Sequence, residues 1–249
     1  LMAARSSKEM VTMAEFEEAI ERGAVGLERK SRIMHADEKQ RVAYHEAGHA
    51  LVAYVTPHAD PVHKVTILPT GMALGVTQTM PEERHAYSKD HLLDRICMTM
   101  GGRVAEEIVF SQQTTGAAND LEVATRLAKR MVREWGMSAK VGPMAWESQQ
   151  HVFLGEDLMT SQREYSDDTA RMIDEEVAKI LHEQEDRARQ LLTHHRRGLD
   201  LVAEALLEKE TIEGSEVSRL VQLGLVPSGG NGVDADAAVS GAHEPTPRA

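Results

Sequence analysis

Residues 41–55 read RVAYHEAGHALVAYV, a run in which two histidines and a glutamate interrupt an otherwise mostly apolar segment. Alanine and leucine favour helix. The run ends at Thr56, and a residue that precedes a proline, here Pro57, is pushed out of the α region. We therefore predict a helix over residues 37–55, with the His-Glu-Ala-Gly-His motif of residues 45–49 near its middle.

The spacing of the two histidines is that of a metal site. On a helix, positions i and i+4 share one face, so His45 and His49 can bring imidazole nitrogens to one point, at about 2.0–2.1 Å from a zinc ion. Glu46 lies about 100° further around the helix, where its carboxylate reaches a water on the metal rather than the metal itself. Zinc lowers the pKa of its water to about 7, and a neighbouring carboxylate can take the proton as the water attacks a carbonyl. The pattern predicts amide hydrolysis with Glu46 as the general base.

A catalytic zinc site needs a third protein ligand. One possibility is Glu106 or Glu107, in the segment GGRVAEEIVF. The other is Asp120, in TTGAANDLEVAT: in a helix that begins near Asn119 it shares the apolar face, so a metal would offset the cost of burying its carboxylate. The residues alone leave both open, because Asp120 also suits a first-turn acid that complements the helix dipole, and the glutamates also suit solvated positions or partners of Arg103.

The rest of the chain predicts a mainly helical protein with a small antiparallel sheet. Two runs enriched in β-branched residues, VHKVTIL (62–68) and ALGVTQT (73–79), flank a turn-like segment. A Gly-Gly pair at residues 101–102 interrupts one helical segment, which predicts close approach of another helix. Further helices are expected over residues 88–110, 121–135, 166–195, 199–208 and 214–223, with loop and one short strand over 137–165.

Composition narrows the class of protein. Aromatic residues are only 4% of the 249, and the net charge of −12 comes without a Lys/Arg cluster that would track a phosphate backbone, so we expect no nucleic-acid partner. The single cysteine, Cys97, supplies no pair of zinc ligands, and any metal must therefore bind histidines and carboxylates. No run of 18 apolar residues is present, and we expect the chain as given to be soluble.

Many ordered segments resemble the protease domain of the FtsH family, membrane-anchored ATP-dependent zinc metalloproteases with an AAA ATPase module. The similarity covers about residues 36–224. Its segments are AYHEAGHALVAY, PVHKVTILPTG, ALGVTQTMPEER, GGRVAEEIVF, TTGAANDLEVAT, MVREWGMS, VFLG, YSDDTARMIDEEV and EALLEKETIEG. Carried over position by position, the resemblance implies zinc ligands at His45, His49 and Asp120, rather than at either glutamate, and the catalytic base at Glu46.

The resemblance also implies an architecture. It is a mainly α, helical zinc metalloprotease domain over residues 34–226, with a small β-sheet beside the active site whose edge, within residues 73–79, pairs with an extended substrate. Residues 1–33 correspond to the end of the AAA ATPase lid region. Residues 227–249, rich in Gly, Ala, Pro and Asp, are expected to be a disordered C-terminal tail.

For function, the resemblance implies one zinc ion per subunit and processive degradation of misfolded or tagged cytoplasmic and membrane polypeptides. ATP and Mg²⁺ would enter only through the ATPase module, whose nucleotide-binding motifs are not found in this sequence. A homo-hexamer is expected. The full-length protein is expected in the bacterial plasma membrane, with this domain facing the cytoplasm.

Overall fold

The structure is a computed structural model, and it describes residues 34–69, 74–80, 83, 86–146 and 165–226, together with residues 10–13, 16 and 19. The predicted tail over residues 227–249 lies outside the described residues, as do residues 147–164, most of the segment in which one short strand was expected. The predicted lid region over residues 1–33 lies almost wholly outside them. These three assignments stay predictions.

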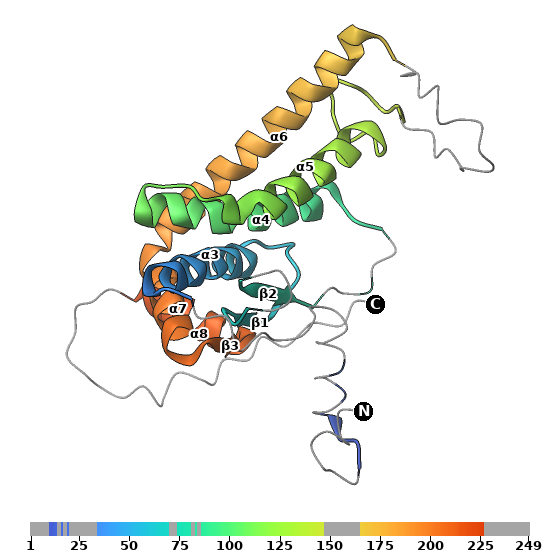
Figure 1. The fold of residues 1–249 in the computed structure, drawn as a ribbon. Coiled ribbons are helices and arrows are strands. Elements are labelled where there is room, and N and C mark those ends of the chain that lie inside the picture. The colour runs from blue at the N-terminus through green and yellow to red at the C-terminus, as the bar shows by residue number, and fades with distance from the viewer. Residues whose placement is uncertain are drawn as a thin grey trace.

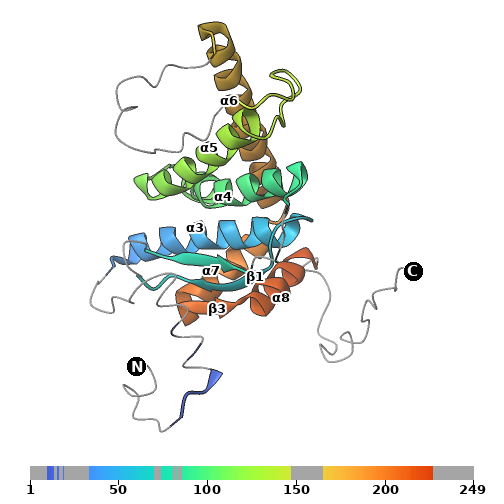
Figure 2. The same cartoon turned by 90° about the vertical axis from the view of Figure 1, so that its right-hand side faces the viewer.

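Helix α3 (Ala36–Val55) is the centre of the fold, and it confirms the helix predicted around the His-Glu-Ala-Gly-His motif. It lies between helix α4 on one side and the sheet with helices α7 and α8 on the other (Figures 1 and 2). All of residues 46–53 are buried, because this part of the helix is covered from both sides. Thr56 ends the helix in an extended conformation, as expected before Pro57.

Helix α4 (Lys89–Phe110) packs along α3 and begins where predicted, with the Ser88 side chain accepting a hydrogen bond from the His91 amide. The two helix backbones meet at Gly48 and Gly101. A Cβ atom added to Gly48 would lie 2.4 Å from the Gly101 carbonyl oxygen, and one added to Gly101 would lie 2.7 Å from the Gly48 carbonyl oxygen. The predicted close approach of another helix is confirmed.

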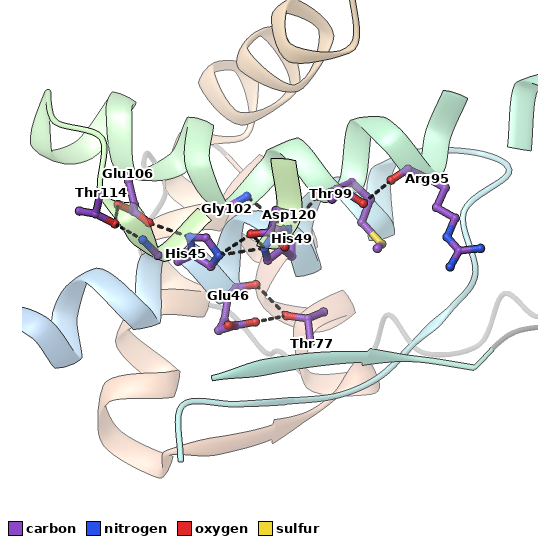
Figure 3. A network of polar contacts seen from close by, with 12 residues as sticks. His45, Glu46, His49, Thr77, Arg95, Thr99, Gly102, Glu106, Thr114 and Asp120 are labelled. Atoms are coloured by element: carbon purple, nitrogen blue, oxygen red, sulfur yellow. Dashed lines mark hydrogen bonds and ion pairs between the residues drawn. The ribbon is translucent and has the colours of Figure 1, made fainter. Parts of the chain in front are cut away.

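The sheet has three antiparallel strands in the order β2-β1-β3. Strands β1 (Val62–Thr66) and β2 (Val76–Thr79) are the two predicted strands, shorter than expected. Strand β3 (Thr211–Glu213) was not predicted, because three residues between two helices carry no alternating pattern. Since β1 is the middle strand, β2 lies at an edge of the sheet, and its Thr77 side chain meets Glu46 of α3 (Figure 3).

The remaining helices confirm the mainly α class. They are the short 3₁₀ helix η1 (Thr115–Ala117) and helices α5 (Ala118–Arg133), α6 (Asp167–His194), α7 (Arg196–Lys209) and α8 (Gly214–Leu225). Helix α6 crosses α4 and α5 on the side away from the sheet (Figure 1). Within the described part of the chain, no helix is long and apolar enough to cross a membrane.

Candidate metal centre

The two motif histidines meet at one point, as their spacing predicted. His45 and His49 stand one turn apart on α3, and their Nε2 atoms are 3.1 Å from each other (Figure 3). Both side chains are largely shielded from solvent, with exposed fractions of 13% and 10%. Two imidazole nitrogens therefore face the same small volume.

Asp120 joins this pair from the first turn of α5. Its Oδ2 atom lies 3.1 Å from His45 Nε2 and 3.5 Å from His49 Nε2. In a tetrahedral zinc site with ligand distances of about 2.0–2.1 Å, donor atoms are about 3.3–3.4 Å apart. The three separations match that edge length, so the donor set fits a zinc ion. Among the described residues, this is the one group of three or more His, Cys, Asp or Glu side chains that could hold a metal.

The other ring nitrogens fix the direction of the imidazole lone pairs. His45 Nδ1 is 2.7 Å from Glu106 Oε1. His49 Nδ1 is 2.8 Å from the Met98 carbonyl oxygen and 3.3 Å from the Gly102 amide nitrogen, and the shorter contact, to the carbonyl oxygen, decides its role. A carbonyl oxygen only accepts, as does an ionised carboxylate, so both Nδ1 atoms donate. In a neutral imidazole Nε2 is then an acceptor. With neutral rings, the ligand atoms of both histidines and of Asp120 therefore face one small volume, an arrangement that a cation stabilises.

Glu106, a rival candidate for the third ligand, occupies a different place. It is buried at 3% exposure and contacts the far nitrogen of His45, while its second oxygen accepts a hydrogen bond from the Thr114 hydroxyl at 2.8 Å. This position is typical of a carboxylate that orients a metal-binding histidine through its other ring nitrogen. Glu107, the other rival, instead pairs with Arg189 of α6.

The electrostatic environment also favours a cation at this point. Burial by itself lowers the pKa of His45, but its hydrogen bonds with Asp120 and Glu106 outweigh burial and raise that pKa to about 10. Burial raises the pKa of Asp120, yet hydrogen bonds with His45 and His49 hold it well below its usual range. The pKa of Glu106 is lowered in the same manner, against burial, by His45 and Thr114. Ionised carboxylates on both sides of one imidazole thus stabilise positive charge.

Two residues of the site were not singled out from the sequence. Gly102 of α4 faces both imidazoles, and a Cβ atom added there would lie 2.5 Å from His49 Nε2 and 2.7 Å from His45 Nε2. Its missing side chain keeps the convergence point open. Thr77 of β2 donates a hydrogen bond to the Glu46 carboxylate. The Gly-Gly pair was the sequence signal for Gly102, whereas nothing in the strand pattern indicated Thr77.

One helix carries two histidines and an adjacent glutamate, a second helix supplies an aspartate, and a sheet edge lies beside them. This fold and this site are those of a zinc metallopeptidase domain. Residues 32–220 match the sequence model described as Peptidase family M41, and the chain belongs to this family.

Curated relatives agree with this assignment and confirm the resemblance to FtsH. The chain is 58% identical over 222 residues to the ATP-dependent zinc metalloprotease FtsH of Acidimicrobium ferrooxidans, a match that covers 89% of this chain and 34% of that protein. It is 50% identical to FtsH 3 of Symbiobacterium thermophilum (91% and 37% covered) and 48% identical to FtsH of Thermotoga maritima (89% and 37%). The chain spans about a third of the length of these relatives.

Proposed function

We propose that this domain hydrolyses peptide bonds with one zinc ion held by His45, His49 and Asp120, and with Glu46 as the catalytic base. The observation that carries the proposal is the convergence of three ligand atoms, from two helices, at mutual distances of 3.1–3.5 Å. Two imidazoles and a carboxylate leave a fourth tetrahedral position open, which distinguishes a catalytic from a structural zinc site.

Different groups at the site would have different roles in the reaction. A bound zinc ion supplies Lewis acidity, which polarises the scissile carbonyl and makes water a nucleophile near neutral pH. Glu46 accepts the proton of the attacking water and later donates it to the leaving amine nitrogen. Glu106 and the Met98 carbonyl hold the imidazole rings in the orientation that ligation requires.

The substrate we propose is an extended polypeptide that adds a strand to the free edge of β2. Main-chain hydrogen bonds would then give binding with little dependence on sequence. This placement is supported by the position of β2 at the sheet edge next to Glu46. It suits a protease that degrades misfolded or tagged proteins of varied sequence.

The wider setting is proposed from the relatives, which are named ATP-dependent zinc metalloproteases. Residues 34–226 would be the protease domain, preceded by the end of an ATPase lid and followed by a disordered tail. An AAA module that binds ATP and Mg²⁺ would deliver the substrate. The assembly would be a homo-hexamer anchored in the plasma membrane, with this domain on the cytoplasmic side.

Replacement of Glu46 by glutamine tests the assignment of the base. Glu46→Gln should bind one zinc ion per chain and lose at least about 100-fold in the rate of hydrolysis of a fluorogenic peptide, since general base catalysis contributes about 10²–10⁴-fold. Glu122→Gln, on the exposed side of α5, is the matched control and should keep full activity. Retained hydrolysis in a well-folded Glu46→Gln protein would remove Glu46 from this role.

A further inference from the structure

We propose that Thr77, on edge strand β2, is a positioning residue that holds the Glu46 carboxylate in its reactive orientation. The inference rests on the proposed function, because it takes Glu46 as the catalytic base. It adds a residue that carries no charge, binds no metal and lies outside the His-Glu-Ala-Gly-His motif.

The contact is short and is made to a buried group. The Thr77 hydroxyl lies 2.7 Å from Glu46 Oε2 and 3.2 Å from the main-chain carbonyl oxygen of the same residue (Figure 3). A hydroxyl has one proton to donate, so the shorter contact, to the carboxylate, takes it. Glu46 is only 6% exposed, and a buried carboxylate without a hydrogen-bond donor is costly. Thr77 therefore holds the carboxylate at a fixed place.

Gly75 limits the carboxylate from another direction. A Cβ atom added to Gly75 would lie 2.8 Å from both Cγ and Oε1 of Glu46. The backbone of residue 75 thus packs against the side chain that Thr77 holds by a hydrogen bond.

The strand that carries Thr77 and begins directly after Gly75 is itself held in place. Thr77 pairs with Val65 of the middle strand, and Val65 is fully buried and pairs on its other side with Ile212. Because β2 is also the edge on which we propose that the substrate docks, one strand sets the position of both the peptide and the base. A glutamate side chain has three rotatable bonds, and fixing it in advance removes an ordering cost from the reaction step.

Three variants of the zinc-loaded chain test the role. Thr77→Val keeps a β-branched side chain of nearly the same shape and removes the hydroxyl, whereas Thr77→Ser retains the hydroxyl. Thr79→Val makes the same chemical change two residues along the same strand, at a threonine that, in the described part of the chain, makes no hydrogen bond to Glu46. Each is assayed for zinc content and for kcat and KM on a fluorogenic peptide.

We expect kcat of Thr77→Val to fall about 10- to 100-fold with KM within about 2-fold of the parent, because a misplaced base slows only the chemical step. Thr77→Ser should recover kcat to within about 3-fold, and Thr79→Val should match the parent. All should bind one zinc ion. An unchanged kcat in Thr77→Val overturns the proposal. So does a rise in KM alone, or a Thr77→Ser variant as slow as the valine variant.

A second measurement does not depend on activity. In chains stripped of zinc, Thr77→Val should lower Tm by about 3–6 °C. The same substitution should lower Tm by clearly less in a Glu46→Ala background, because the Thr77–Glu46 hydrogen bond is already absent there. Equal shifts in the two backgrounds overturn the proposal. If the zinc-loaded parent cleaves no peptide, the proposed function fails, whereas this cycle still decides whether Thr77 holds Glu46.

Discussion

Gly102→Ala should abolish high-affinity zinc binding without unfolding the protein. The added methyl carbon would lie 2.5 Å from His49 Nε2 and 2.7 Å from His45 Nε2, close to the point at which the two lone pairs meet. Non-bonded carbon atoms settle at about 3.5–4.0 Å, so each ring would have to move by roughly 1 Å. A zinc site tolerates about 0.2 Å in its ligand distances.

The size of the effect follows from this displacement. Changes to groups that only orient zinc ligands cost 10- to 100-fold in affinity. Moving two ligands should cost at least about 100-fold, or about 2.8 kcal/mol of binding free energy. The fold should survive, because the methyl group meets the ends of side chains rather than backbone, and alanine in a helix is about 0.5–1 kcal/mol more favourable than glycine.

The assay is competition for zinc against a chromophoric chelator, with circular dichroism to verify folding. Gly198→Ala is the matched control, since Gly198 lies inside helix α7 and an added Cβ atom would crowd Val221 Cα at 3.2 Å and meet no residue of the metal site. It should bind zinc like the parent. A Gly102→Ala protein that binds zinc with parental affinity would refute convergence of the donors beside residue 102. Loss of zinc in both variants would point to general destabilisation instead.

Three further outcomes are expected. Asp120→Asn should weaken zinc binding at least about 100-fold and Glu106→Gln about 10-fold, because the first removes a ligand and the second an orienting group. Zinc content after dialysis measures both effects. Loss of zinc in the Glu106 variant alone would show that the third ligand is misassigned. Arg187→Met should lower the free energy of unfolding in urea by about 2–3 kcal/mol. The Asp94 carboxylate is 2% exposed and lies 2.6 Å from the Arg187 guanidinium, and the substitution removes this cation. An unchanged midpoint of urea unfolding would contradict the prediction. Hydrogen bonds from a guanidinium and an ammonium group lower the pKa of Glu216 to about 2 from 4.5, so its contribution is present above pH 4.5 and is lost as pH falls toward 2. Because this pair is on the surface, Glu216→Gln should cost under about 1 kcal/mol at pH 7, and the difference from the parent should shrink by pH 2.5 in acid unfolding experiments.

Local signals in the sequence were enough to predict most helices. The helices predicted to start at residues 88 and 166 are α4 and α6, which Ser88 and Ser166 cap, and the residue before Pro57 ends α3. These signals work because a cap or a proline acts on the backbone within one turn, whatever packs against it. Strand β3 carries no such signal: its three residues are ordered by pairing with β1, about 150 positions earlier in the chain.

The same distinction between local signals and long-range packing applies to the residues of the site. The placement of His45 and His49 needs only the pitch of one helix, and residue spacing was sufficient to predict it. Periodicity also predicted that Asp120 faces inward, but it does not give the position along α3 that a residue of α5 reaches. That position depends on how helices pack, so the residues alone could not choose between Asp120 and Glu106, and the choice came from the family resemblance. Thr77 was missed for the same reason.

The packing of α3 against α4 links the motif to the residues that surround it. Gly48, which precedes His49 in the motif, allows the backbones of the helices to touch at Gly101. That contact places the next residue, Gly102, against the imidazole nitrogens, and it places Glu106, about one turn further along α4, against the far nitrogen of His45. A side chain at residue 48 or 101 would separate the helices and move the orienting carboxylate away from its histidine. The glycine inside the motif is therefore as much a requirement of the proposed metal site as the histidines, although it binds nothing itself.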